Sequence, residues 1–567
     1  MTVLSDRPWL ANYADGVPDE IPLPEGSLYD LVAASIEKYP RSVALEFFGR
    51  ETTYAELGGQ IERAAEGLRL LGVQKGDRVA LVLPNCPQHI VAFYAVLRLG
   101  AIVVEHNPLY TPRELRHQFE DHEAKVVIAW NNVVATLQDF PADVAIETII
   151  SVDVTRSMPL LTRTLLRLPI AKARESRTAL TTSVRGTIIW EELLKSAPID
   201  AHIVRPEADD LALIQYTSGT TGYPKGAMLT HLNLGTNAAQ ARAWVPTVPP
   251  GTAVVYAVLP MFHAYGLTLC LTFAMSMGAR LVLFPKFDPE LVLAVIKKRP
   301  ATFLPAVPPI YERLTAAADA AGVSLKGIEI AISGAMPLSA SVVEPWEERT
   351  GGTLVEGYGL SETSPVLMAN PVGPTRRAGT VGLPLPNTEI RVVDPENPSV
   401  DRGPGEQGEL IVRGPQVFSG YWGKPEETAE VFVPTADEGK DWFRTGDIVT
   451  VDPDGFVSVV DRIKELIITG GFNVAPSEVE EALRQHASIA DAAVVGLPSE
   501  HNGEIVVAAV VLAKGATLDE TTVRDFVRAN LAAYKVPKSV ISVEELPKSL
   551  IGKVLRKQVR EQLLAER

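Results

Sequence analysis

The sequence predicts an α/β protein in which residues 1–462 fold around largely parallel sheets and a small α+β unit follows. Three observations support this prediction. Strand-like and helix-like segments alternate up to about residue 450, the run DRVALVL at 77–83 is typical of a buried strand, and turn-rich sequence begins near Asp447. At 567 residues and 46% hydrophobic content, the chain is long enough for several cores of roughly 150 residues each.

The alternation is clearest between residues 53 and 104. Thr53 and Glu56 form an expected capping box, and apolar residues at helical spacing follow it as far as Gly72, where the helix should stop. Residues 77–83 then read as a buried strand, residues 88–99 as a helix ended by Gly100, and residues 101–104 as a second strand. This order predicts a parallel βαβ unit covered by helices.

Residues 156–185 form a basic insertion in an acidic protein. They contain seven Arg or Lys residues against one acid, Glu175, with leucines interleaved. One interpretation is a solvated surface loop, and the other is a partly amphipathic segment that contacts a membrane surface. The residues themselves leave both interpretations open.

Residues 260–279 carry no charge, and residues 261–279 are long enough to span a membrane as a helix. However, His263, Gly266 and Gly278 interrupt this run, and β-rich segments flank it at 254–259 and 281–284. A buried helix or the wall of a ligand tunnel is therefore the favoured interpretation.

The residue composition changes near Asp447, where the second unit begins. Turn residues at 452–455 lead to a strand, a Gly-Gly turn and a helix that has Pro476 near its start. Strand-like runs at 492–495 and 505–512 and helical patterns at 519–533 and after Gly552 complete a unit of roughly one hundred residues. The boundary is expected near residues 462–464, which gives domains 1–462 and 463–567.

The composition excludes several classes of function. A net charge of −16 disfavours nucleic acid as a partner, so any anion must be bound locally. The two cysteines, Cys86 and Cys270, exclude a disulfide framework and suit a reducing cytoplasm, and the nine histidines have no metal-ligand spacing. The first residues include acids and lack the apolar core of a signal peptide, so a cytoplasmic location is expected.

The most informative stretch is YTSGTTGYPKG at residues 216–226. Its glycines allow the backbone to approach an anion closely, its hydroxyls and N–H groups can donate to phosphate oxygens, and Lys225 adds positive charge. The stretch follows an apolar run at 211–214, so it is expected to leave a strand as a loop. The spacing GxxxxGK[ST] is absent, because no Ser or Thr follows Lys225, which disfavours an ordinary P-loop nucleotidase.

Four further motifs carry chemistry. SGAMPLS at 333–339 and EGYGLSET at 356–363 read as glycine turns, RTGD at 444–447 places an acid on a turn, and PKSLIGKVLR at 547–556 places Lys553 on an exposed-looking turn. Each is a common surface feature when taken alone. There is no GxSxG nucleophile elbow.

Together, in this order and at these distances, the five motifs resemble those of the adenylate-forming superfamily, which includes acyl-CoA synthetases, peptide-synthetase adenylation domains and luciferases. The resemblance covers roughly residues 25–560. It implies a large N-terminal domain of several layered, mostly parallel sheets and a small mobile C-terminal domain that carries the catalytic lysine. It also implies a reaction in two steps: an acid and ATP give acyl-AMP and pyrophosphate, and CoA then takes the acyl group and releases AMP.

By matching position, the resemblance assigns an ATP and AMP site to Thr217, Ser218, Gly219, Thr220, Thr221, Gly222, Lys225, Gly334, Ala335, Tyr358, Gly359, Glu362, Thr363, Asp447 and Arg462. Glu362 and Thr217 would ligate Mg²⁺, a hard cation suited to oxygen ligands. Tyr358 would stack on adenine, and Asp447 would accept hydrogen bonds from the ribose. Lys553 would reach between the acyl carboxylate and the α-phosphate, which makes Lys553, Glu362 and Thr217 the expected catalytic residues.

The resemblance also places the remaining functional residues. Gly470, Gly471 and Phe472 would line the tunnel for CoA, Lys464 would be the hinge between the domains, and His263 and Gly266 would belong to the acyl pocket. No charge in residues 261–279 could meet an amino group, which disfavours an amino-acid substrate. The basic insertion resembles that of bacterial long-chain fatty-acid–CoA ligases acting at membranes.

The expected function is therefore an AMP-forming long-chain fatty-acid–CoA ligase that uses ATP, Mg²⁺ and CoA. A medium-chain or aryl-acid (coumarate-like) CoA ligase shares every motif, and an enzyme that loads its adenylate onto a carrier protein is a further alternative. A nonenzymatic acyl- or nucleotide-binding protein is disfavoured because Lys553 and Glu362 are both present. The sequence leaves open a homodimer and peripheral contact with the inner face of a membrane through residues 156–185.

Overall fold

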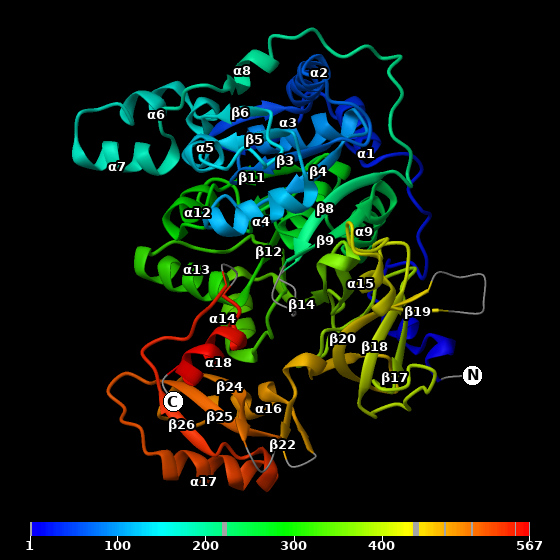
Figure 1. Ribbon diagram of the computed structural model, residues 1–567, viewed down its shortest axis with the longest axis vertical. Coiled ribbons are helices and arrows are strands. Elements are labelled where there is room, and N and C mark those ends of the chain that lie inside the picture. Colours follow the sequence, from blue (N-terminus) through cyan, green and yellow to red (C-terminus); the bar gives the residue numbers. More distant parts are fainter. Residues whose placement is uncertain are drawn as a thin grey trace.

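The computed structural model describes residues 3–217, 224–434, 441–469, 472–499, 503–549 and 552–565. Within these residues the strands form four sheets, of which the two largest are mostly parallel and lie in the first part of the chain (Figure 1). The predicted α/β class is confirmed.

The seven-stranded sheet contains the predicted βαβ unit. Its neighbours pair in parallel except for the last two strands, which form an antiparallel hairpin. In spatial order its strands are β7 (Ile188–Ile189), β6 (Thr148–Val152), β5 (Val126–Trp130), β3 (Arg78–Val82), β4 (Ile102–Glu105), β8 (Leu211–Thr217) and β9 (Lys225–Thr230).

The nine-stranded sheet has a parallel centre and antiparallel edges. Its strands, in spatial order, are β16 (Leu383–Pro384), β15 (Val366–Ala369), β14 (Thr353–Gly359), β13 (Ile330–Ser333), β12 (Phe303–Ala306), β10 (Val254–Ala257), β11 (Arg280–Leu283), β1 (Val43–Phe47) and β2 (Arg50–Thr53). One continuous apolar core joins the two large sheets to their helices.

Helices cover these sheets. They are α1 (Leu28–Lys38), α2 (Tyr54–Leu70), α3 (Pro87–Arg98), α4 (Pro112–His122), α5 (Asn131–Gln138), α8 (Trp190–Leu193), α9 (His231–Trp244), α12 (Pro289–Ile296), α13 (Pro308–Ala321) and α14 (Ala340–Thr350). The predicted capping box at the start of α2 is confirmed, since Thr53 and Glu56 each accept a hydrogen bond from the other's backbone N–H.

The uncharged run at 260–279 folds as a short interrupted helix between β10 and β11. It consists of α10 (Ala264–Gly266), one π-helical turn (Leu267–Thr272) and α11 (Phe273–Ser276), and almost all of its side chains are buried. In the part of the chain that the structure describes, no helix is both long enough and apolar enough to cross a membrane. The buried-helix interpretation is therefore confirmed.

A third, antiparallel sheet precedes the C-terminal part of the chain. It contains β17 (Glu389–Val393), β18 (Gly408–Arg413), β20 (Trp442–Val451), β19 (Phe432–Val433) and β21 (Val457–Arg462), and α15 (Pro425–Glu430) lies beside it. The RTGD motif was predicted to be a turn, and that prediction is wrong. It lies within β20, where Gly446 has a φ of 71° and allows the strand to stay paired through an irregular register.

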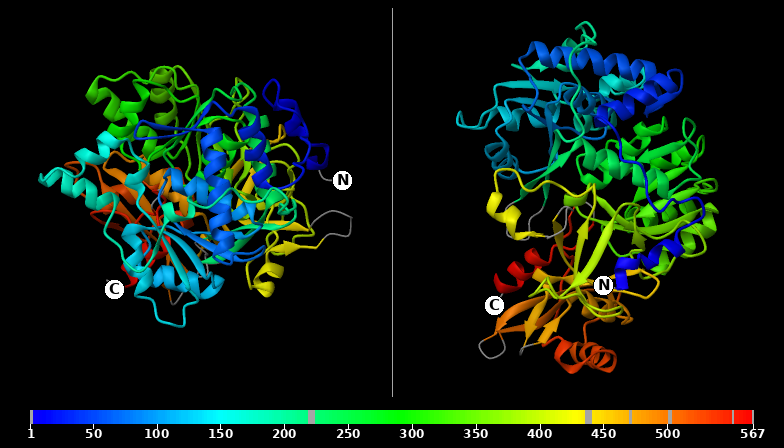
Figure 2. Two further views of the ribbon diagram at one scale, coloured as in Figure 1. Left: turned by 90° about the horizontal axis from the view of Figure 1, so that it is seen from above. Right: turned by 90° about the vertical axis from the view of Figure 1, so that its right-hand side faces the viewer.

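The C-terminal sheet is buried on both faces. It contains β23 (Phe472–Val474), β22 (Ile467–Thr469), β25 (Gly503–Leu512), β24 (Ile489–Ser499) and β26 (Ser539–Ser542). Val494 and Val506 pack in the cluster that includes residues of α16 (Pro476–Arg484) and α17 (Glu520–Asn530), whereas Val495 and Val507 pack against α18 (Arg556–Ala565) on the other face. Figure 2 shows this part at one end of the molecule, opposite the helices of the first 200 residues.

The basic insertion forms two short helices, α6 (Leu160–Leu165) and α7 (Ala171–Leu180), which project from the side of the molecule (Figures 1 and 2). Large apolar side chains are exposed on it: Leu160 at 76%, Leu161 at 72% and Ile170 at 54%. The segment therefore presents apolar as well as basic side chains to solvent.

Candidate functional site

The glycine-rich loop closes the hairpin of β8 and β9. Thr217 ends β8, Lys225 begins β9, and the two residues face each other in register. Five predicted phosphate-binding residues lie outside the described residues: Ser218, Gly219, Thr220, Thr221 and Gly222. The Nζ atom of Lys225 lies 3.7 Å from Oε2 of Glu427 and 5.1 Å from the ring centroid of Tyr421.

Glu362 lies on a 3-10 turn (Ser361–Thr363) directly after β14. Its Oε1 accepts a hydrogen bond from the Tyr421 hydroxyl at 2.9 Å, and its backbone oxygen accepts one from the N–H of Phe418 at 2.8 Å. Burial raises the pKa of the Glu362 carboxyl, while the Tyr421 hydrogen bond and the charge of Arg462 oppose this shift. A largely desolvated carboxylate of this kind favours a nearby cation.

Thr363, the next residue, stabilises this turn. Its hydroxyl contacts the backbone oxygens of Leu360 and Pro365, at 3.0 Å and 2.5 Å, and the side chain is fully buried. The predicted ATP-site residue thus holds the backbone that presents Glu362.

Three predicted residues meet at a buried carboxylate. Asp447 on β20 accepts a hydrogen bond from the Tyr358 hydroxyl at one oxygen and pairs with Nε of Arg462 at the other, 2.9 Å away. Burial raises the pKa of Asp447, and the charge of Arg462, the Tyr358 hydrogen bond and the charge of Lys553 oppose it. The sequence placed these residues in separate motifs, and the fold brings them together.

The EGYG half of its motif was predicted to be a glycine turn, and this is wrong. Residues 356–359 lie on β14, which pairs with β15. Gly359 is required there, because a Cβ atom at this position would lie 1.8 Å from the backbone oxygen of Pro365. Sequence reasoning missed Glu356, which lies on the same strand face as Tyr358 and whose pKa burial raises to about 8.

Gly334 and Ala335 follow β13 in a sharp bend, and Ala335 has a φ of 66°. A Cβ atom on Gly334 would come within 3.1 Å of the Tyr265 ring. The Tyr265 hydroxyl donates to the backbone oxygens of Ile332 at 2.7 Å and Ala306 at 3.1 Å. The Tyr265 ring therefore packs against the bend at Gly334.

The expected acyl-pocket residues lie at the start of the buried helix that contains Tyr265. His263 caps α10, with its Nδ1 accepting from the Tyr265 N–H, and burial lowers the pKa of His263 to about 4. Gly266 packs against the chain before it, since a Cβ atom there would lie 2.2 Å from the Pro260 oxygen. Both residues thus flank Tyr265, which packs against the bend at Gly334.

Lys553 reaches this site from the C-terminal part of the chain. Its loop packs on α13 and on the segment that follows β13, because a Cβ atom on Gly552 would lie 3.4 Å from Pro309 and 3.5 Å from Met336. Burial lowers the pKa of Lys553, and the charge of Arg462 lowers it further, while Glu465 and Asp447 oppose the shift. The exposed setting predicted for Lys553 is therefore wrong.

The expected hinge and CoA tunnel lie nearby in sequence. Lys464 is in a 3-10 turn (Ile463–Glu465) between β21 and β22. Gly470 and Gly471 lie outside the described residues, and Phe472 begins β23 opposite Thr469. The tunnel prediction therefore stays a prediction.

Arg556, which sequence reasoning also missed, joins the two sides of Lys464. Its guanidinium contacts Glu480 at 2.8 Å and Ser477 at 2.7 Å on the C-terminal side, and it lies 3.5 Å from Asp461 on β21. It also pairs with Glu465. The Ser477 N–H donates to Asp461 at 2.8 Å, so Asp461 is held by two groups across the expected hinge.

Comparisons with known proteins agree with this geometry. Residues 32–422 match the AMP-binding enzyme family, and residues 478–553 match the AMP-binding enzyme C-terminal domain. A long-chain-fatty-acid–CoA ligase of Bacillus subtilis (strain 168) is 39% identical over 98% of each chain, and 4-coumarate–CoA ligase 1 of Solanum tuberosum is 35% identical over 90% of this chain and 89% of that protein.

Solved structures share the fold. The ATP-bound crystal structure of MatB from Rhodopseudomonas palustris has a TM-score of 0.80 at 33% identity, covering 94% of this chain and 98% of that one. The apo structure of MatB has a TM-score of 0.70 over the same shares. The resemblance drawn from the five motifs is confirmed, and the chain belongs to the AMP-binding enzyme family, the adenylate-forming enzymes.

Proposed function

We propose that this protein is an ATP-dependent, AMP-forming fatty-acid–CoA ligase that acts on long-chain acids. The observation that carries the proposal is the position of Lys553, which comes from the C-terminal part of the chain and lies within electrostatic reach of the Asp447–Arg462 pair. The family membership and the 39% identity to a long-chain-fatty-acid–CoA ligase support the same activity.

The nucleotide site that we propose uses the residues that converge on this pair. Asp447 and Arg462 would bind the ribose, Tyr358 the adenine face, and the bend at Gly334 and Ala335 the adenine edge. The phosphates would lie over the loop between Thr217 and Lys225, where backbone N–H groups and hydroxyls can donate to them.

A magnesium ion fits the residues around Glu362. Mg²⁺ is often held by one or two carboxylates together with substrate phosphates, and Glu362 is a partly buried carboxylate whose pKa desolvation raises. When bound, Mg²⁺ would neutralise phosphate charge, with Glu362 and Thr217 as its protein ligands.

The first step joins two anions, so the site must supply positive charge. One oxygen of the fatty-acid carboxylate attacks the α-phosphorus of ATP, the bond to the β-phosphate breaks, and pyrophosphate leaves. Lys553 would bind the carboxylate and the α-phosphate as charge concentrates between them, and Lys225 would bind the departing phosphates. No proton transfer is needed at this step.

In the second step the CoA thiol loses its proton to solvent and attacks the acyl carbonyl, the bond from that carbon to the AMP oxygen breaks, and AMP leaves. We propose that domain 463–567 turns about Lys464, so that Gly470, Gly471 and Phe472 line the CoA tunnel while Lys553 withdraws. Lys464 lies in a short turn between β21 and β22, where a few backbone angles can change.

Long-chain acids are favoured by the buried, uncharged helix of residues 264–276 next to His263. A coumarate-like or medium-chain acid is the second candidate, which the 35% identity to a 4-coumarate–CoA ligase supports. A carrier-loading enzyme would form the adenylate without consuming CoA.

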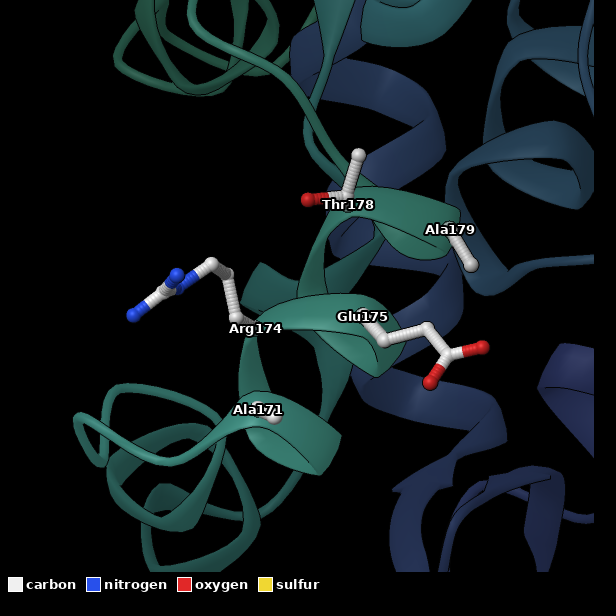
Figure 3. Close-up of a pocket in the computed structure, with 5 residues that line it drawn as sticks. All are labelled: Ala171, Arg174, Glu175, Thr178 and Ala179. Atoms are coloured by element: carbon white, nitrogen blue, oxygen red, sulfur yellow. The ribbon is translucent and has the colours of Figure 1, made fainter.

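We also propose that α6 and α7 bring the enzyme to the inner face of a membrane, with a cytoplasmic location otherwise. The exposed leucines and basic residues of this segment support the proposal. A depression on α7, about 500 Å³ in volume, is lined by Ala171, Arg174, Glu175, Thr178 and Ala179 (Figure 3). All five belong to one helix, with Arg174 and Glu175 pointing apart, so it is a helix surface and not a substrate pocket.

A substrate panel tests the proposed function. CoA-dependent pyrophosphate release should be fastest with acids of about sixteen carbons and slow with acetate and cinnamate-type acids, because an apolar tunnel gains affinity with each added methylene. Pyrophosphate release without CoA consumption would support the carrier-loading alternative, and equal rates for cinnamate and palmitate would contradict long-chain specificity.

A further inference from the structure

Tyr421 lies between two residues of the proposed phosphate and magnesium site that are far apart in sequence. It is 7% exposed and follows β18 in a short segment, residues 418–422. This segment pairs with β9: the Met228 N–H donates to Gly420, the Trp422 N–H donates to Gly226, and Tyr421 bridges Ala227. The pairing fixes Tyr421 beside Lys225.

The Tyr421 side chain contacts both functional residues. Its hydroxyl donates to Oε1 of Glu362 at 2.9 Å, and its ring centroid lies 5.1 Å from the Lys225 ammonium, within the range of a cation–π contact. The neighbouring residue Phe418 also donates its N–H to the Glu362 backbone. One short segment therefore holds the glycine-loop hairpin and the Glu362 turn together.

We infer that Tyr421 is a positioning residue that sets Lys225 and Glu362 at a fixed separation, so that ATP and its magnesium ion are bound as one unit. The inference rests on the proposed function. The hydroxyl engages Oε1 and would hold the Glu362 carboxylate in place for the magnesium ion. The ring contacts the Lys225 ammonium, and Oε2 of Glu427 lies 3.7 Å from the same nitrogen, so a phosphate can replace Glu427 while Lys225 keeps its contact with the ring.

The two contacts can be separated by two substitutions. Tyr421→Phe removes the hydroxyl and keeps the ring, whereas Tyr421→Leu removes both. Loss of an outer partner of a metal ligand typically lowers metal affinity by about 10- to 100-fold. Loss of the hydroxyl should therefore lower the affinity for ATP only when magnesium is present. Loss of the ring should lower this affinity with or without magnesium.

Calorimetric titration of ATP into the protein tests this without turnover, once in EDTA and once with Mg²⁺. Tyr421→Phe should bind ATP like the wild type in EDTA and should lose about tenfold or more of the affinity gained with Mg²⁺. Tyr421→Leu should bind ATP several-fold more weakly in both buffers. Tyr39→Phe, which removes a hydroxyl at the end of α1, serves as the matched control and should behave like the wild type.

A double-mutant cycle separates positioning from folding. In Glu362→Gln the Tyr421→Phe change should have little further effect on the affinity gained with Mg²⁺, because the hydrogen bond acts through the carboxylate. Equal losses for Tyr421→Phe with and without Glu362→Gln, or no loss in either background, would overturn the inference. Failure of the wild type to bind ATP in either buffer would instead refute the proposed function on which the inference rests.

Discussion

At the scale of single residues, Lys553 carries the clearest prediction. In Lys553→Gln, or after acetylation of Lys553, the activation free energy of adenylate formation should rise by about 3 kcal/mol. The reason is that a charge that stabilises the transition state is lost. Thioester formation from supplied acyl-AMP and CoA should stay near the wild-type rate. Single-turnover assays of each half-reaction measure both values, and equal losses in the two would show a structural role instead.

The pH dependence of the first half-reaction provides a control for this prediction. Burial lowers the pKa of Lys553 in the free protein, so the ammonium loses its proton at a lower pH than an ordinary lysine. The kcat/KM for ATP should therefore fall as pH rises, with a midpoint below 10.5, the ordinary value. The residual activity of Lys553→Arg should lack this alkaline limb, since arginine stays protonated.

Motifs located most single residues of the candidate site but did not reveal their environment. Lys553 seemed exposed because Ser549 and Gly552 are turn formers, yet its loop packs on Pro309 and Met336 and its side chain is partly buried. Tyr421 gave no signal because its hydrogen-bond partner, Glu362, is 59 positions away. Contacts between distant segments leave no local pattern in a sequence.

At the scale of elements, the turn at Lys464 should act as the pivot between the half-reactions. Lys464→Pro fixes φ and removes a backbone donor at that point. Because Lys553 already lies at the candidate site, this variant should largely keep adenylate formation and lose thioester formation steeply. Single-turnover kinetics decide the question, and a proportional loss in both steps, or in neither, excludes Lys464 as the pivot.

The contacts of Asp461 should favour the orientation that the structure shows. Asp461 lies before the turn, and Arg556 and Ser477, which bind it, lie after it. Asp461→Asn should therefore slow adenylate formation several-fold, as expected for a weakened buried ion pair, without slowing thioester formation.

Glu465→Gln provides the matched control for Asp461→Asn. Glu465 also pairs with Arg556 but lies on the far side of Lys464, so it should move with Arg556. Its substitution should affect both half-reactions alike. The same kinetic pattern in both variants would contradict the idea that Asp461 holds one orientation.

Most elements could be predicted from periodicity and caps, including α2, β3, α3 and β4. The errors fell on glycine-containing strands. The sequence shows a glycine at 359 and at 446, but not whether it forms a turn, admits a nearby backbone as Gly359 does, or relieves a strand irregularity as Gly446 does. That choice depends on neighbours supplied by the rest of the fold.

At the scale of the whole molecule, the projecting helices α6 and α7 should bind anionic membranes. The segment 156–185 has a surplus of basic residues, each worth about 1 kcal/mol or less near such a surface. Replacing Arg163, Arg167 and Arg174 by Gln should reduce sedimentation with anionic vesicles most strongly at low salt. Leu160→Ser with Leu161→Ser should reduce it at all salt concentrations, because burial of apolar side chains is little affected by screening.

Unchanged vesicle sedimentation in both sets of variants would exclude this surface as a membrane contact. Lys125→Gln, on the same large part but paired with Glu147, is a suitable control for the loss of basic charge. It should leave vesicle binding unchanged.

The arrangement of the whole molecule was the part least accessible from sequence. Composition predicted a boundary near residues 462–464. The contact of Gly552 with Pro309 and Met336 could not be predicted, because these residues lie on separate segments and no sequence motif links them.

The most direct test of the account follows the carboxylate oxygen. Palmitate labelled with ¹⁸O in both carboxylate oxygens is incubated with the protein, ATP, Mg²⁺ and CoA, and the products are analysed by mass spectrometry. If the carboxylate attacks the α-phosphorus, one labelled oxygen should appear in AMP, none in pyrophosphate, and the other should stay in palmitoyl-CoA. Unlabelled AMP, or label in inorganic phosphate together with ADP, would contradict an adenylate-forming mechanism.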